Sequence, residues 1–82
     1  MSSLDPALKD ALRRLRAVRS TRPEDPSAVM ELAEWRDAMA AVLEELARVL
    51  PIEEDRIRAS HEANCARTQA AQIRAKAAMD NN

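Results

Sequence analysis

The chain has 82 residues, of which 46% are hydrophobic and 33% charged, and its formal net charge is −1. It contains no glycine, one cysteine and one histidine. Phosphate-binding loops, tight β-hairpins and nucleophile elbows depend on positive φ angles, so a chain without glycine is not expected to form them. The length and composition predict a single all-α domain over residues 1–82, with three helices that associate into a helical bundle.

The first helix is predicted over residues 6–20. Asp5 and Pro6 form a typical helix start, with aspartate as the N-cap and proline at the first helical position. Apolar residues then recur at helical spacing along one side of this segment, namely Leu8, Ala11, Leu12, Leu15 and Val18. Pro23 favours an extended conformation before it, so the following residues are expected to form a linker.

Basic residues crowd this first helix and the linker that follows it. Between positions 9 and 22 the only acid is Asp10, whereas the cations are Lys9, Arg13, Arg14, Arg16, Arg19 and Arg22. Such a cluster is typical of a surface that contacts a phosphate backbone. Two simpler interpretations are a solvated face or pairing with acidic residues of the second helix. No aromatic residue lies in this segment, which argues against stacking of single-stranded bases.

The second helix is predicted over residues 26–50, with Asp25 as its N-cap and Pro26 at its first position. Large apolar residues alternate three and four positions apart, as in a coiled-coil seam, at Leu32, Trp35, Met39, Val42, Leu46 and Val49. We expect this face to contact a partner protein or a second copy of the chain, with Trp35 as the anchor. The alternative is that Trp35 belongs to the core of the chain itself.

Acidic residues dominate the middle of the sequence. Residues 24–62 carry eleven acidic and four basic side chains, a charge of −7, whereas residues 1–23 carry +4. An acidic surface is therefore predicted on the second helix and the start of the third, at Glu31, Glu34, Asp37, Glu44, Glu45, Glu53, Glu54 and Asp55. Such a surface would select a partner of opposite charge, although a solvated outer face gives the same pattern.

The third helix is predicted over residues 51–79, opened by Pro51. The proline either turns this helix back on the second or leaves it as a kinked extension. We expect a hairpin of the second and third helices, with the first helix packed across both. The stripe that would face the neighbouring helices is made mostly of small residues, namely Ile52, Ala59, Ala63, Ala66, Ala70, Ile73 and Ala77.

His61 and Cys65 lie four positions apart, a spacing that suits metal ligands on a helix. A closed zinc site needs four ligands and the chain has no other histidine or cysteine, so only a dimer would supply the rest. We therefore expect no metal and no cofactor. The ordinary interpretation is a half-buried ridge of Ile57, His61, Cys65, Thr68 and Gln72. Ser60 and His61 point about 100° apart on a helix, so they form no nucleophile–base pair, and an enzyme is not expected.

The first residues, Met1 to Pro6, lack the basic and apolar regions of a signal peptide, and no apolar run is long enough to span a membrane. A cytoplasmic protein without a membrane partner is expected. The function these patterns favour is a non-catalytic protein–protein interaction module that forms a homodimer. It would be a small adaptor, co-chaperone or inhibitor of the kind that phages and plasmids encode. The alternative is a nucleic-acid-binding regulator that uses the basic first helix.

Overall fold

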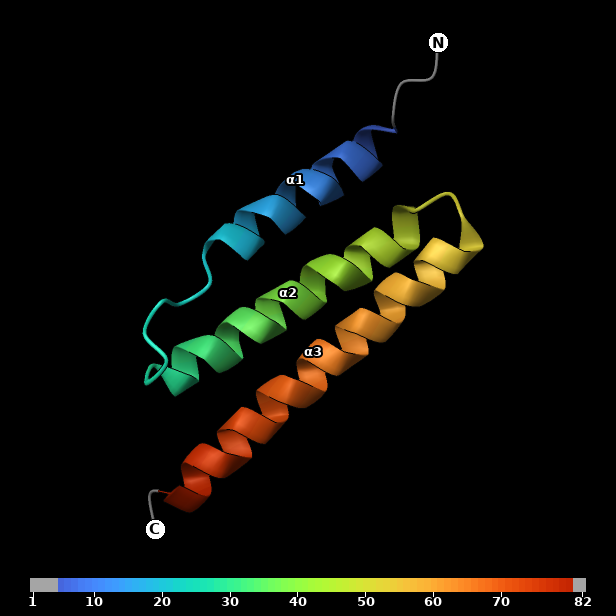
Figure 1. Ribbon diagram of the computed structural model, residues 1–82. Helices are drawn as coiled ribbons and strands as arrows, with labels where there is room; N and C mark the ends of the chain where they lie inside the picture. Colours follow the sequence, from blue (N-terminus) through green and yellow to red (C-terminus); the bar gives the residue numbers. More distant parts are fainter. Residues whose placement is uncertain (1–4, 81–82) are drawn as a thin grey trace.

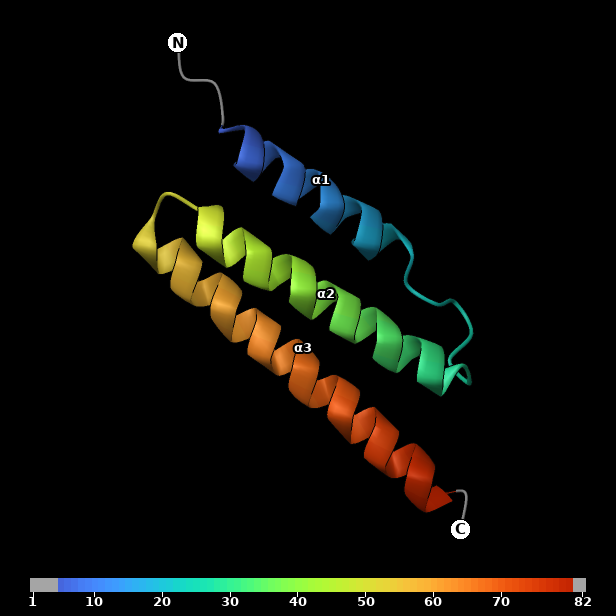
Figure 2. The same ribbon diagram turned by 180° about the vertical axis from the view of Figure 1, so that it is seen from behind.

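The computed structural model describes residues 5–80, which form three helices: α1 (Pro6–Ser20), α2 (Val29–Val49) and α3 (Glu53–Asp80). The all-α fold predicted from the sequence is confirmed. The ends of the predicted domain, residues 1–4 and 81–82, lie outside the described part of the chain. In Figures 1 and 2, α2 lies between α1 and α3, and α3 runs antiparallel to α2.

The bounds predicted for α1 are confirmed. The Asp5 carboxylate accepts a hydrogen bond from the backbone N–H of Ala7 at 3.1 Å, which satisfies one of the amides that has no partner inside the helix. Leu8, Ala11 and Leu15 are buried, whereas Leu12 and Val18 are half-buried. At the other end, the Thr21 amide donates to the Val18 carbonyl at 3.0 Å and closes the helix.

The predicted start of α2 was wrong by three residues, because Asp25 is engaged in a turn that precedes the helix. Its carboxylate accepts hydrogen bonds from the Ser27 amide at 2.9 Å and the Ser27 hydroxyl at 2.7 Å. These two bonds, the amide bond first, hold the pKa of Asp25 below its usual value. Pro26 and Ser27 therefore stay in the turn, and α2 begins at Val29.

The predicted start of α3 was also wrong, by two residues. Leu50 is extended, with φ −65° and ψ 135°, as expected of a residue that precedes proline. Pro51 and Ile52 form a bend, Ile52 is 57% exposed, and α3 begins at Glu53. The Arg56 guanidinium donates to the carbonyls of Leu50 at 3.0 Å and Pro51 at 3.3 Å. The proline thus turns the chain back, and these bonds satisfy carbonyls at the end of α2.

The α2–α3 hairpin packs along a seam of alanines. On α2 the residues with no exposed surface are Ala33 and Ala40, and on α3 they are Ala63 and Ala70. Ala59 and Ala66 continue the seam with exposures of 5% and 8%. Side chains this small allow two helices to approach closely, but each buries little apolar area. The predicted alanine stripe of the third helix is confirmed, except for Ile52.

The first helix does not pack across the hairpin, so this part of the predicted arrangement was wrong. In residues 5–80, α1 packs against α2, and no α-carbon of α1 lies within 8 Å of one in α3. The α-carbons accordingly span 58 × 22 × 13 Å, a single layer of three helices. The two neighbours occupy different sides of α2: Asp37 and Glu44 pair with arginines of α3, whereas Trp35 and Glu45 contact α1. No helix between residues 5 and 80 has the length and apolar character required to cross a bilayer.

Candidate functional site

The large apolar face of α2, predicted as the partner or dimer interface, is largely covered within the chain. Val42 and Leu46 are each 7% exposed and belong to the core that α1 and α2 share. The other four predicted residues, Leu32, Trp35, Met39 and Val49, are half-buried. Four of the six lie in or against the core that contains the leucines of α1, namely Met39, Val42, Leu46 and Val49, whereas Leu32 lines a hollow with Ile73 and Ala77 of α3.

Trp35 links this face to the end of α1. Its indole Nε1 donates a hydrogen bond of 2.7 Å to the Val18 carbonyl, 17 positions earlier in the chain. The guanidinium groups of Arg22 and Arg36 lie 5.2 and 5.8 Å from the centre of the ring, within the range of cation–π attraction. Trp35 is half-buried and contacts the end of α1, but it is not one of the buried residues of the core.

Three of the eight predicted acidic residues form ion pairs between helices. Asp37 lies 2.7 Å from Arg74 and 3.7 Å from Arg67, and Glu44 accepts two hydrogen bonds from Arg67. Asp37 pairs with Arg74, and Glu44 pairs with Arg67. Glu44 follows Asp37 by seven residues on α2, and Arg67 precedes Arg74 by seven residues on α3. These ion pairs therefore hold the antiparallel helices in one register.

The remaining acidic residues do not form a continuous surface. Glu31 and Glu34 are exposed near the start of α2, whereas Glu53 and Glu54 are exposed at the start of α3. Because the helices are antiparallel, these two pairs lie at opposite ends of the hairpin (Figure 1). Asp55 is half-buried and lies 3.9 Å from Arg58 on its own helix. The structure thus divides the predicted acidic surface into three separate groups.

The hydrogen bonds from Arg67 lower the pKa of Glu44 below its usual value. An unfolded chain therefore binds a proton at Glu44 at a higher pH than the folded chain does. We expect the protein to lose stability as the pH falls through and below about 4.3, the ordinary value for glutamate. Thermal unfolding followed by circular dichroism between about pH 7 and pH 3 measures this loss.

Arg67→Gln tests the assignment, because it removes the donor and keeps a polar side chain of similar length. The variant is expected to unfold at a lower temperature near neutral pH and to show a shallower acid dependence. Lys76→Gln is the matched control, since Lys76 is an exposed α3 cation without an ion pair among the described residues. Equal acid dependence in wild type and Arg67→Gln would contradict a role for this contact.

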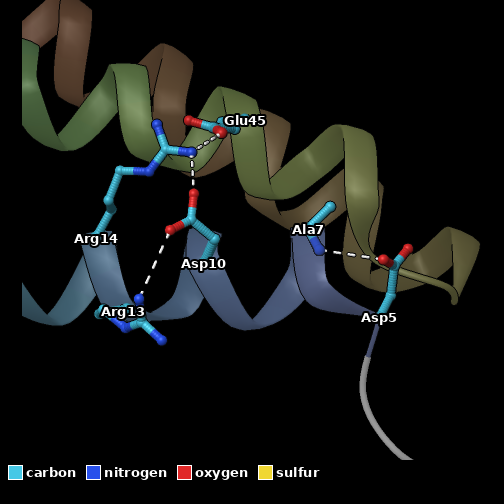
Figure 3. Close-up of polar contacts among 6 residues, drawn as sticks. All are labelled: Asp5, Ala7, Asp10, Arg13, Arg14 and Glu45. Atoms are coloured by element: carbon cyan, nitrogen blue, oxygen red, sulfur yellow. Dashed lines mark hydrogen bonds and ion pairs between the residues drawn. The ribbon is translucent and has the colours of Figure 1, made fainter.

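The cations of α1 divide into two groups. Arg14 donates a hydrogen bond of 2.6 Å to Asp10 and also contacts Glu45 of α2. Both acids raise the pKa of its guanidinium, and the hydrogen bond to Asp10 raises it most. Figure 3 shows Arg14 directed toward Glu45, whereas Arg13 is directed away from Glu45 and lies 4.0 Å from Asp10. The simple interpretation that α1 pairs with the acidic side of α2 therefore holds for Arg14.

Lys9, Arg13 and Arg16 surround the half-buried Leu12 in a shallow hollow of about 290 Å³, which we call the Leu12 depression. The four residues recur at positions i, i+3, i+4 and i+7, so they share one face of α1. All three cations are exposed, and no carboxylate lines the hollow. Arg19 is also exposed, and Arg22 lies over Trp35. These cations were identified from the sequence, but the depression was not, because helical spacing groups Leu12 with the apolar side of the helix and does not show that it stays half-exposed.

The ridge that contains His61 and Cys65 is exposed, and the prediction that it is half-buried was wrong. Ile57, His61, Cys65, Thr68 and Gln72 are all exposed, because they lie on the side of α3 opposite to the alanine seam. The Cys65 Sγ and the His61 Nε2 are 3.6 Å apart. Within residues 5–80, no group of three or more histidine, cysteine or acidic residues is arranged to hold a metal ion.

Comparisons with protein-family models, with curated proteins and with solved structures found no match to this chain.

Proposed function

We propose that the protein is a non-catalytic protein-binding module that binds an acidic amphipathic helix at the Leu12 depression. This proposal keeps the class of function expected from the sequence and changes the surface. The α2 face and the acids Asp37, Glu44 and Glu45 already have partners within the chain. The observation that carries the proposal is the depression itself, an apolar side chain surrounded by three cations on one helix face.

The chemistry of the depression specifies the partner. Lys9, Arg13 and Arg16 lie at positions i, i+4 and i+7, so carboxylates at matching spacing on a second helix would oppose all three. An apolar side chain between those carboxylates would cover Leu12. Helices of this kind bind grooves through their apolar face and are selected by their charges.

The free energies expected for the contacts at the depression predict a transient complex. Exposed ion pairs contribute about 0–1 kcal/mol each, and full burial of a leucine contributes about 1.5–3 kcal/mol. Three ion pairs and one leucine contact therefore sum to a few kcal/mol, and a millimolar complex already requires about 4 kcal/mol. The upper end of this sum, about 6 kcal/mol, lies between the values for a millimolar and a micromolar complex, so an affinity near the millimolar range follows. Binding should therefore weaken clearly when one contributor is removed.

A second candidate function is binding to a nucleic-acid backbone, which the three exposed cations that line the depression favour. Lys9, Arg13 and Arg16 would contact phosphates, and Arg19 would extend the positive surface. Duplex binding of this type weakens with salt in proportion to the number of phosphates contacted. Phosphate binding does not require an apolar contact. A substitution of Leu12 should therefore weaken binding of an amphipathic helix and leave binding of a duplex unchanged.

Fluorescence anisotropy with two labelled probes tests the proposal: a helical peptide with leucine and glutamate at helical spacing, and a DNA duplex. We expect the peptide to bind the wild type. Leu12→Ser and Arg13→Glu/Arg16→Glu should each weaken this binding at least about tenfold. The matched control is Arg48→Glu/Arg58→Glu, which makes the same charge change at exposed positions of α2 and α3.

Each remaining outcome contradicts the proposal. Duplex binding that falls steeply with salt, is lost in Arg13→Glu/Arg16→Glu and is retained in Leu12→Ser would establish the nucleic-acid candidate instead. Equal losses in the control and the α1 variants would mean that net charge alone governs binding. No binding of either probe at low salt would exclude both candidates.

A further inference from the structure

The outer face of α3 carries two potential metal ligands one helical turn apart. His61 and Cys65 are both exposed, and their Nε2 and Sγ atoms are 3.6 Å apart. The neighbouring alanines, Ala63 and Ala66, face α2 and are buried. The imidazole and the thiol therefore point away from the layer, where a ligand can reach both.

The distance between these atoms fits a single tetrahedral zinc ion. Zinc bonds are about 2.3 Å to a cysteine sulfur and about 2.0–2.1 Å to a histidine nitrogen, which places the two ligands of a tetrahedral site about 3.5 Å apart. The observed 3.6 Å matches this separation without a backbone movement. We propose that His61 and Cys65 chelate a thiophilic divalent cation, best matched by Zn²⁺, and that a second copy of this chain completes the site.

The second copy is required by the ligand count. A structural zinc site has four protein ligands, and the chain has one histidine and one cysteine. A two-fold axis passing α3 near residue 63 would bring the partner's His61 and the partner's Cys65 to the same ion. The resulting site has two thiolates and two imidazoles, a donor set that zinc favours. Each thiol releases its proton to solvent as its sulfur binds the metal.

The same face of α3 has the character of a helix–helix contact. In a chain that is 33% charged, the exposed centre of this face is uncharged over about five turns. Its central residues are Ile57, His61, Asn64, Thr68, Ala71 and Ala75. Depletion of charge is what distinguishes the centre of an interface from the remaining surface. Ile57, which is 62% exposed, would be covered by an antiparallel α3 of the second copy.

The test uses the full-length, metal-free protein in a reductant that does not bind metals. It is titrated with Co²⁺ and, separately, with Zn²⁺. We expect a tetrahedral cobalt spectrum with a thiolate charge-transfer band, saturation at one metal ion per two chains, and a shift from monomer to dimer in sedimentation. Cys65→Ser and His61→Gln should each abolish the spectrum and the shift. Because both side chains are exposed, neither substitution should alter unfolding of the metal-free protein.

Asn64→Glu places a charge in the proposed contact and keeps both ligands, so it should reduce dimer formation at a given metal concentration. Arg13→Glu/Arg16→Glu changes α1 alone and should bind metal as the wild type does, so this result is independent of the proposed function. The proposal is overturned by absence of the thiolate band at equimolar cobalt, or by one metal per chain without dimerisation. Dimerisation of Cys65→Ser in the presence of a chelator would also overturn it.

Discussion

Replacing Trp35 by alanine is expected to lower the free energy of unfolding by about 3 kcal/mol, the lower end for loss of a large aromatic side chain, because the indole is only half-buried. The substitution removes the hydrogen bond to the Val18 carbonyl and the ring that the guanidinium groups of Arg22 and Arg36 approach. For a domain of this size the total stability is about 4–12 kcal/mol. Urea unfolding followed by circular dichroism, which does not require the tryptophan, measures the loss.

Trp35→Phe separates the contribution of the indole hydrogen bond from that of the aromatic ring. Phenylalanine retains an aromatic ring near both guanidinium groups and lacks the indole N–H. The loss of stability should therefore include about 1 kcal/mol for the missing hydrogen bond and remain below the loss in Trp35→Ala. The Thr21 amide and hydroxyl still donate to the Val18 carbonyl, so that acceptor keeps two partners. A loss below about 0.5 kcal/mol in Trp35→Ala would match an ordinary surface substitution and contradict a role for this residue in holding α1 on α2.

Ala63→Leu should destabilise the protein by about 3 kcal/mol, the upper part of the usual range for overpacking. Ala63 has no exposed surface and lies in the seam where α2 and α3 approach each other. The additional carbons of leucine have no space there, so α3 must move outward and weaken its ion pairs with Asp37 and Glu44. Chemical denaturation monitored by circular dichroism measures the change.

Ala41→Leu is the matched control, because Ala41 is an exposed residue of α2 and leucine is almost as good a helix former as alanine. Its effect should stay within about 0.5 kcal/mol of the wild type. If Ala63→Leu unfolds like the control, the helices do not pack closely at this alanine, and the seam contributes little to the fold.

The sequence by itself determined the features that depend on neighbouring residues. Asp5 and Pro6 placed the start of α1 correctly, since N-capping requires only a side chain and the next turn of backbone. The alanine stripe of α3 followed from helical spacing, and Ala59, Ala63, Ala66 and Ala70 of that stripe are buried. The same capping rule failed at Asp25. An aspartate before proline can either cap a helix or bond to the residue two positions on in a turn, and Asp25 bonds to Ser27 in a turn.

Only the tertiary structure decided which side of each helix meets which neighbour. Large residues on α2 gave the clearest pattern in the sequence, yet Ala33 and Ala40 are its most buried residues, because close approach to α3 favours the smallest side chains. The charges of α2 likewise gave no indication that Glu45 pairs with α1 while Glu44 pairs with α3. The Leu12 depression and the exposed His61–Cys65 pair also follow from the arrangement. A single layer leaves the outer faces of α1 and α3 uncovered, and helical periodicity alone does not distinguish a layer from a bundle.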